Sequence, residues 1–544
     1  MLIRSIVLTL KRNWPAILVL SLVIGYLLTG FNKGLEVHDE GLAVYGADRI
    51  LHGDMPYRDF WALYGPGDFY ALALMFKLFG SSLLVERFRA LGVTVAVVVL
   101  SYVIAGRFVQ PKWALFAPLF IAIWLYEPGA GPDIAIVMLG LLSLLFLLNY
   151  LSSKRSLFLV LAGLTVGITA LFRPDQGLLS LAATLVPLML FARWRGAKDS
   201  KARPMQAWKA GAILFSAAAI VTVPVAVWLI KSVPHAYLTD EFFTYPVKVY
   251  PKVRSLPFPT PIASLSALRS SPLPKYLYDS MYQLRFYYPI LVFVGAVVVL
   301  IRVFLRRKTA ALGGDFYGMM ALLAYGLAFL AHTMIRADSV HLRGAAAMAA
   351  VLMPAVVYRV GKSRAWKAVL WVLIVLTGFP TAYMAVESGR RSLDLHETGF
   401  AFNIERARGI QANPYAGRYE DLVRYIQDIV PEGGKIFVGN MRHDLIFAND
   451  SMLYFLANRQ CATRYNDLVP GTANTEPVQR QIISDIQRNH VKLIVLRIPW
   501  LSDEPNDSRK STGVIILDQF IRRNYRFDQQ YLEYSVLLRK AAAR

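Results

Sequence analysis

Long apolar segments separated by short polar ones make up the first 386 residues of the chain. Segments such as 212–230, 290–303 and 368–377 are almost unbroken apolar runs, and charged residues stand mainly at the segment ends. A helix needs about 20 apolar residues to span a membrane, and a charge inside lipid costs several kcal/mol. The pattern therefore predicts a polytopic α-helical membrane protein with about eleven transmembrane helices. The predicted spans are 14–31, 83–106, 112–127, 133–151, 156–172, 177–193, 210–231, 287–304, 316–333, 342–360 and 366–386.

Composition agrees with a membrane protein. The chain is 56% hydrophobic and 17% charged, whereas soluble domains have roughly 25% charged residues. A net charge of +23 would suit a nucleic-acid partner, but much of the basic excess lies in short loops between apolar segments. The positive-inside rule produces that distribution, so we expect no nucleic-acid partner. The single cysteine, Cys461, excludes an intramolecular disulfide and a multi-cysteine zinc site.

Basic residues gather in every second loop between the predicted spans. If the eleven helices cross the membrane in turn, all six basic groups fall on one side, which the positive-inside rule assigns to the cytoplasm together with the N-terminus. No cleavage pattern follows the first span, so we expect it to remain as an anchor. The basic groups lie within 4–12, 107–112, 154–155, 193–209, 302–308 and 359–367. The other side carries 32–82, 128–132, 173–176, 232–286, 334–341 and everything after 387.

Beyond residue 387 the pattern becomes that of a soluble domain. Amphipathic helical segments alternate with short apolar strands, which predicts an α/β domain with a largely parallel sheet. We therefore divide the chain into a transmembrane domain, 1–386, and an extracytoplasmic α/β domain, 387–544. The tail has no phosphate loop and no nucleophile elbow, so we expect it to shape the acceptor site or stabilise the fold. Its predicted helices are 419–429, 479–489 and 513–523, and its predicted strands are 435–439, 492–496 and 531–538.

The first outer loop, 32–82, is richest in candidate chemistry. Its Asp39-Glu40 pair follows the first span and begins an amphipathic helix that runs to Leu51. A carboxylate at the membrane surface can accept the proton of an attacking hydroxyl as a general base. Asp39 would equally suit the N-cap of a helix that starts at Glu40, and spacing alone leaves both roles open.

One order of features runs through residues 10–180. A membrane helix precedes the Asp-Glu pair and an amphipathic helix, and a stretch rich in Pro, Tyr and Gly leads into Phe76-Lys77-Leu78-Phe79-Gly80 and a helix that opens with Arg87 and Arg89. This order resembles the GT-C superfamily of membrane glycosyltransferases. The branches it looks most like are the protein O-mannosyltransferases and the bacterial lipid A aminoarabinose transferases.

The resemblance implies an enzyme that moves a sugar from a polyprenyl-phosphate donor, such as undecaprenyl phosphate, to a glycan, lipid or protein acceptor. The reaction would take place on the outer face of the bacterial inner membrane, with inversion at the anomeric carbon. The role of base carries over to Asp39, with Glu40 as its neighbour. A second acid of such enzymes precedes the fourth helix, which makes Asp133 the candidate here, although an N-cap is the local alternative.

The leaving phosphate of this reaction needs a cation as its charge grows. Aminoarabinose transferases place a Lys-Pro-Pro where this chain has Gly65-Pro66-Gly67, and that lysine contacts the donor phosphate. Because the lysine is missing here, we expect arginine, which binds phosphate through paired hydrogen bonds, or histidine to replace it. Arg336 would also suit the anchoring of a helix end at the interface. The cation candidates are Arg58, Arg173, Arg336 and His341, with Asp59, Tyr64, Asp175 and Asp338 as further site candidates.

A metal site has no diagnostic spacing in this sequence. Asp39, Glu40, Asp133 and His341 would suit magnesium or manganese, but the similar branches are thought to work without metal. We therefore predict no cofactor and leave a divalent ion open. The outer loop 232–286 is rich in Tyr and Pro, which suits an interfacial aromatic belt, a cover over the site or an acceptor contact.

Two other functions compete with the transferase. A flippase or transporter of lipid-linked sugars often has internal repeats and broken helices. We find no such repeat, and the acids cluster on outer loops. A sensor with an outer ligand-binding domain gives no reason for the Asp-Glu pair or the group around Arg336. The expected partners are therefore the lipid-linked sugar, its acceptor and membrane lipids.

Overall fold

The computed structural model describes residues 2–125, 132–196, 207–263, 272–306, 312–359, 364–499 and 501–541. Residues 127–131, within the turn predicted to precede Asp133, and much of the basic segment 193–209 lie outside the described residues. Contacts between Cα atoms divide the chain into two compact units. The first comprises Met1–Gly30, Leu91–Val225 and Pro257–Arg390, and the second comprises Phe31–Ala90, Ala226–Leu256 and Arg391–Arg544.

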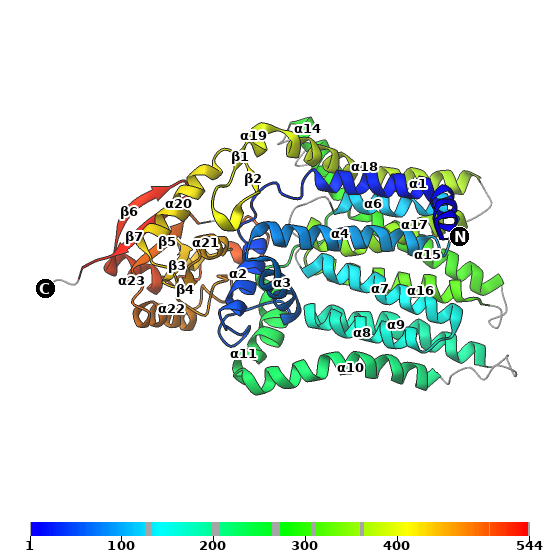
Figure 1. The fold of residues 1–544 in the computed structure, drawn as a ribbon, viewed down its shortest axis with the longest axis horizontal. Coiled ribbons are helices and arrows are strands. Elements are labelled where there is room, and N and C mark those ends of the chain that lie inside the picture. Colours follow the sequence, from blue (N-terminus) through cyan, green and yellow to red (C-terminus); the bar gives the residue numbers. More distant parts are fainter. Residues whose placement is uncertain are drawn as a thin grey trace. The chain divides into compact units, whose positions relative to one another are not determined.

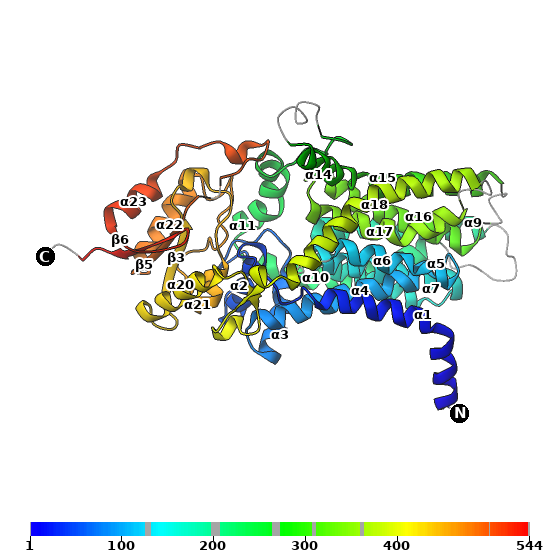
Figure 2. The same cartoon turned by 90° about the horizontal axis from the view of Figure 1, so that it is seen from above.

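The first unit is a bundle of apolar helices that lie roughly parallel to one another (Figures 1 and 2). Eight helical segments of the described chain are long and apolar enough to cross a membrane, and the predicted spans 14–31, 112–127 and 156–172 correspond to shorter apolar helices. The prediction of a multi-pass membrane protein is confirmed. The helices that enter this unit are α1 (Leu2–Leu28), α4 (Leu83–Ala105), α5 (Pro111–Ala114), α6 (Phe116–Trp124), α7 (Pro132–Ser153), α8 (Leu157–Phe172), α9 (Pro174–Gly196), α10 (Ala207–Ser232), α14 (Leu273–Leu284), α15 (Tyr287–Arg306), α16 (Gly314–Thr333), α17 (Ser339–Arg359) and α18 (Arg364–Leu393).

Helix α17 is the most deeply buried helix of this unit. The run from Ala345 to Ala350 is fully buried, and α6, α7, α15 and α16 pack around the helix. Small residues allow such close packing between membrane helices. At Gly344 an added Cβ would lie 2.3 Å from the ring of Phe329, so the packing requires glycine there. This packing fixes the start of α17, where Asp338 and His341 lie.

Only Arg173 separates α8 from α9. Pro174 occupies the first turn of α9, where its missing N–H costs nothing. An added Cβ at Gly177 would lie 2.3 Å from the Cβ of Ala170, so the two helices meet closely beside the turn. The tight turn places Arg173 between the ends of α8 and α9.

The second unit contains a five-stranded sheet in the order β4-β3-β5-β7-β6. Strand β3 pairs in parallel with β4 and β5, whereas β7 pairs antiparallel with β5 and β6. The sheet is mixed rather than largely parallel, because the segment predicted as one strand at 531–538 overlaps both arms of a hairpin. The strands are β3 (Lys435–Asn440), β4 (Gln460–Cys461), β5 (Leu493–Arg497), β6 (Tyr525–Tyr531) and β7 (Tyr534–Arg539), and a separate pair is formed by β1 (Phe400–Ala401) and β2 (Gln411–Ala412).

Helices cover both faces of this sheet (Figure 2). Alternate residues of β3 point to opposite sides, so Val438 joins the core beneath α20 and α21, whereas Phe437 joins the core beneath α22 and α23. The predicted tail helices are confirmed within a few residues. They are α20 (Ala416–Ile429), α22 (Glu476–Arg488) and α23 (Ile516–Asn524), and α21 (Met452–Ala457) was not among the predicted helices.

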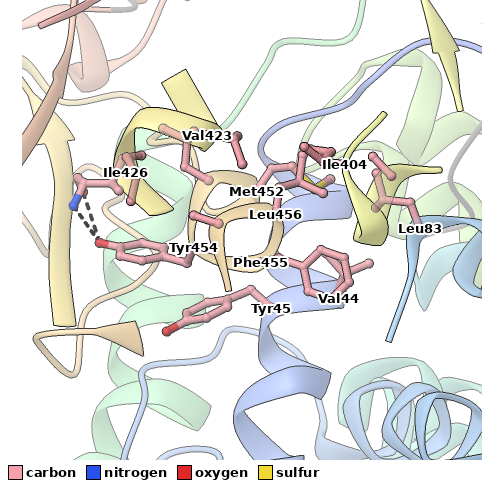
Figure 3. Packing of buried hydrophobic residues seen from close by; sticks show 14 of the residues in the cluster. Val44, Tyr45, Leu83, Ile404, Val423, Ile426, Met452, Tyr454, Phe455 and Leu456 are labelled. Atoms are coloured by element: carbon pink, nitrogen blue, oxygen red, sulfur yellow. Dashed lines mark hydrogen bonds between the residues drawn. The ribbon is translucent and has the colours of Figure 1, made fainter. Parts of the chain in front are cut away.

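The first outer loop shares its core with the C-terminal segment. Its helices are α2 (Asp39–Leu51) and α3 (Pro66–Phe79), and Val44 and Tyr45 of α2 pack against Tyr454 and Phe455 of α21 (Figure 3). An added Cβ at Gly41 would lie 2.6 Å from the backbone nitrogen of Met452. Each large apolar side chain buried here contributes about 1.5–3 kcal/mol. The loop and the tail therefore fold as one body.

The segment after α10 also belongs to the second unit. It contains α11 (His235–Thr239), a π-helix (Asp240–Val249) and α12 (Tyr250–Val253). Glu241 is buried, pairs with Arg464 and accepts the backbone N–H of Ala62 at 2.7 Å. This part of the predicted outer loop 232–286 is thus tied to both the first outer loop and the tail.

Candidate functional site

Glu40 and Arg87 form a buried ion pair in the second unit. Their side chains are 2% and 1% exposed, and Nη2 of Arg87 lies 2.7 Å from Oε2 of Glu40. Arg87 also donates to the carbonyl oxygens of Phe31, Lys33 and Gly34. The pair holds the loop after α1 against the start of α4. Arg87 therefore neutralises the charge of Glu40, and the pair has a structural role.

Asp39 differs from its neighbour because its side chain is 64% exposed. It lies in the first turn of α2, which begins at Asp39 rather than at Glu40. The amides of His38 and Glu40 donate to the side chain of Glu36 at 2.9 and 2.6 Å, so Glu36 caps this end of the helix. Burial and the nearby charge of Asp39 raise the pKa of Glu36.

His38 links Asp39 to the C-terminal segment. Its Nδ1 lies 3.1 Å from Oδ1 of Asp39, and its Nε2 lies 3.4 Å from Oδ1 of Asp467. Burial lowers the pKa of His38, but the hydrogen bonds and charges of the two carboxylates outweigh it and raise the pKa to about 10. His38 is therefore an imidazolium between two carboxylates at neutral pH. Neither His38 nor Asp467 was among the site residues predicted from the sequence.

Arg58 and Asp59 form a pair of their own. Nη2 of Arg58 lies 2.7 Å from Oδ2 of Asp59, which also accepts the amide of Met55 at 2.8 Å. The hydroxyl of Tyr57 donates to the carbonyl of Tyr64 at 2.7 Å. These contacts give the predicted site residues Arg58, Asp59 and Tyr64 roles in shaping the loop.

In the first unit, Arg173 joins two predicted acids. Its Nη1 lies 2.9 Å from Asp133 and its Nη2 lies 3.1 Å from Asp175. Nδ1 of His332 lies 4.0 Å from Asp175, and the ring centroids of His332 and His341 are 4.9 Å apart. The outer turns predicted to share one side of the membrane thus contribute to one cluster.

Asp338 organises the other end of this cluster. Its Oδ1 accepts the backbone N–H of His341 at 2.9 Å and lies 2.7 Å from Nδ1 of the same residue, while Nε of Arg336 lies 2.7 Å from Oδ2. Burial raises the pKa of Asp338, but the hydrogen bonds and charge of His341 and the charge of Arg336 together lower it to about 2. The predicted residues Arg336, Asp338 and His341 lie together as a capped helix start.

Arg285 is a buried cation that the sequence analysis missed. The residue is 4% exposed, its guanidinium carbon lies 3.9 Å from the ring centroid of Tyr282, and Nη1 contacts the sulfur of Met384 at 3.3 Å. Nε and Nη2 find no hydrogen-bond partner among the described residues. Asp338 is close enough to act on Arg285 electrostatically. The available signal was a single arginine directly before an apolar run on the predicted outer side.

The structure brings Asp133, Arg173, Asp175, Arg336, Asp338 and His341 into one connected set through His332, and it joins Asp39 and Glu40 to different partners. No three His, Cys, Asp or Glu side chains of the described chain are grouped so that they could hold a metal ion. The absence of a cofactor stays a prediction.

The sequence matches one known family over part of its length. Residues 64–230, less than half of the chain, match the family of dolichyl-phosphate-mannose-protein mannosyltransferases. No curated protein matches the sequence.

Among solved structures, the fold is similar to that of ArnT from Cupriavidus metallidurans bound to undecaprenyl phosphate. The TM-score is 0.54 and the identity 11%, with 97% of this chain and 99% of that chain covered. The fold is that of the GT-C membrane glycosyltransferases, which confirms the predicted resemblance.

Two other structures show more distant likeness. The oligosaccharyltransferase AglB from Archaeoglobus fulgidus, in complex with an inhibitory peptide and a dolichol-phosphate, has a TM-score of 0.49 and 13% identity, with 90% of this chain and 70% of that chain covered. The arabinosyltransferase EmbB from Mycobacterium smegmatis has a TM-score of 0.42 and 16% identity, with 68% and 40% covered. Both scores are too low to bear on function.

Proposed function

We propose that this protein transfers a sugar from a polyprenyl-phosphate donor to an acceptor on the extracytoplasmic face of the membrane, with Asp39 as the general base. The observation that carries the proposal is the contrast between the two adjacent acids. Glu40 is buried against Arg87, whereas Asp39 is exposed at the start of α2. A base must be accessible to the proton it abstracts, and the exposure of Asp39 supports that role.

The donor phosphate needs a cation with donors to spare. Arg173 and Arg336 already pair with carboxylates, whereas Nε and Nη2 of Arg285 have no partner in the described part of the chain. An uncompensated charge that is buried costs several kcal/mol, so a site that keeps one is suited to receive an anion. We assign the phosphate chiefly to Arg285, assisted by Arg173, Arg336 and His341.

The proposed reaction is a displacement. The acceptor hydroxyl oxygen bonds to the anomeric carbon, the bond from that carbon to the phosphate oxygen breaks, and polyprenyl phosphate leaves with the bonding electrons. Asp39 takes the hydroxyl proton, and the cations offset the charge that grows on the phosphate. Attack opposite the leaving group inverts the anomeric centre. The undecaprenyl phosphate bound to ArnT, which has a similar fold, supports this donor class.

A transfer assay tests the proposal. Purified protein would receive radiolabelled undecaprenyl-phosphate sugars and a crude envelope extract as acceptor, with Asp39→Asn in parallel. Label should enter the extract with the natural protein and not with the variant. The donor from which label is transferred identifies the sugar. Equal transfer by both proteins would remove Asp39 from the role of base. No transfer from any donor by folded protein would favour a flippase, which a transport assay in vesicles would then test.

We also propose that the N-terminus is cytoplasmic and the C-terminal segment is periplasmic in a bacterial inner membrane. The alternation of basic loops supports this orientation. Fusions of alkaline phosphatase after the C-terminus and in the loop at 154–155 should be active and inactive, respectively. The reverse pattern would overturn the orientation.

A further inference from the structure

Asp39 is one end of a chain of three side chains. The imidazole of His38 bridges Asp39 and Asp467, with ring nitrogens 3.1 and 3.4 Å from the two carboxylates. Side-chain exposure falls from 64% at Asp39 to 16% at His38 and 8% at Asp467. An exposed carboxylate is thus tied through one ring to a buried carboxylate that comes from a distant part of the sequence.

The backbone on both sides of Asp467 is clamped. The carbonyl of Asn466 accepts from Ser451 at 2.7 Å and from Asn449 at 3.0 Å, and the amide of Leu468 donates to the side chain of Asn449 at 2.9 Å. A short buried segment with three such bonds has little freedom. Asp467 therefore offers the His38 ring a fixed anchor.

The backbone beneath His38 is clamped as well. Its amide donates to Glu36, which also accepts the amide of Glu40, and Glu40 is held by Arg87. The ring is consequently fixed at its backbone and at Nε2, while Nδ1 faces Asp39. Such an arrangement fits the general pattern in which a third group orients a catalytic side chain.

The set of Asp39, His38 and Asp467 also differs in charge from an ordinary surface ion pair. The carboxylates that face the ring are Glu36 and Asp39 from its own segment and Asp467 from the C-terminal segment, and the charge of Glu40 is taken by Arg87. The protonated imidazole donates through both nitrogens. A cation held beside a carboxylate favours the charged form of that carboxylate, which is the form a base needs.

We propose that His38 is a positioning residue that orients the Asp39 carboxylate and keeps it ionised, and that Asp467 anchors His38 from the C-terminal segment. The proposal rests on the proposed function, in which Asp39 is the base. It gives the C-terminal segment a part in positioning the base, beyond the acceptor-shaping or stabilising role expected from its sequence.

The test is the pH dependence of kcat for sugar transfer, measured on the full-length protein with the donor that the natural protein uses. His38→Gln removes the charge, His38→Lys keeps it, and Asp467→Asn removes the anchor. His52→Gln is the matched control, because His52 lies at the other end of α2, where its Nδ1 lies 2.8 Å from the carbonyl oxygen of Asp48. Thermal unfolding in the same detergent checks that each variant folds.

We expect His38→Gln to lower kcat about 10- to 100-fold through misorientation of the base. Its acid limb should move up by about one pH unit or more, because Asp39 then holds its proton to higher pH. His38→Lys should restore the acid limb but not the full rate. Asp467→Asn should lower kcat less than His38→Gln, and the double variant should be no slower than His38→Gln alone. His52→Gln should match the natural protein.

An unchanged kcat and acid limb in folded His38→Gln would overturn the proposal. If that variant does not fold, Asp467→Asn is the deciding variant, since it leaves the His38 ring in place. A kcat of Asp467→Asn equal to that of the natural protein would then overturn the proposal. Fully additive effects of the two substitutions would show that Asp467 does not act through His38. Failure of the proposed function looks different, because then the natural protein transfers no sugar or Asp39→Asn remains active.

Discussion

Two buried arginines, one in each unit, have opposite surroundings. In the second unit, Arg87 meets Glu40 and three carbonyl oxygens, so its donors are used. In the first unit, Arg285 stacks on Tyr282 and leaves two donor atoms without a partner among the described residues. The first arrangement stabilises the fold, whereas the second carries a cost that a bound anion would remove. The two arginines are alike in burial and differ in how many of their donors are used.

The acids show the same contrast. Glu40 is enclosed with Arg87, whereas Asp39 is exposed and oriented by His38. Asp39 belongs to the second unit and Arg285 to the first. The proposed reaction uses both kinds of charge, because one group would accept a proton and the other would stabilise a leaving phosphate.

The largest expected effect is on the available acid. Asp39→Asn should lower the rate of sugar transfer by about 10²- to 10⁴-fold, the usual contribution of a general base. Its unfolding temperature should fall far less than its rate, because the side chain is exposed, although its pair with His38 is lost. Asp503→Asn, a change at another exposed acid of the second unit, should leave the rate unchanged. Comparable losses in both variants would contradict the special role of Asp39.

Glu40→Gln should instead act on stability. It leaves Arg87 buried without a counter-charge, so we expect a loss of about 3–5 kcal/mol in the free energy of unfolding. Chemical unfolding in detergent measures it. The double variant Glu40→Gln with Arg87→Met should recover part of the loss, because the buried Arg87 charge is removed together with its partner. Natural stability in the single variant would show that the pair is not important to the fold.

Arg285→Met should separate function from stability. We expect transfer to fall about 10²- to 10³-fold, the scale of losing one group that stabilises developing charge. The unfolding temperature should hold or rise, because an uncompensated charge leaves the interior. Arg107→Met is the control, since Arg107 is an exposed basic residue that bonds Asn149 at 2.6 Å on the predicted cytoplasmic side. A destabilised Arg285→Met variant with natural transfer would reverse the comparison.

The last expected effect is the pH dependence of stability, which is small for each pH unit. The pKa of His38 is raised to about 10, so its contribution is full below pH 6.5 and is lost as pH rises toward 10. The pKa of Asp338 is lowered to about 2, so its contribution is full above pH 3.8 and is lost as pH falls toward 2. Each slope is at most about 1.4 kcal/mol per pH unit. The free energy of unfolding of His38→Gln should no longer fall at alkaline pH but should still fall at acid pH. That of Asp338→Asn should show the reverse.

The sequence by itself located the helices and most of the tail. Membrane spans and amphipathic helices are set by the local succession of apolar and polar residues, so 133–151 and 419–429 were predicted close to α7 and α20. The same local signals placed the Asp39-Glu40 pair at the start of a helix after the first span. The mixed sheet was missed because the segment predicted as one strand at 531–538 overlaps both arms of a hairpin, whose second arm pairs antiparallel with β5.

Tertiary structure alone assigned the partners of the charged residues. Glu40 and Asp39 are equivalent in sequence, and what distinguishes them is Arg87, 47 residues away, which buries one of the two. His332, Arg285 and Asp467 were recognised as candidate site residues only from their contacts in the folded chain. Electrostatic and hydrogen-bonding environments depend on distance in space, so the choice between a structural and an available charge becomes visible only when the chain is folded.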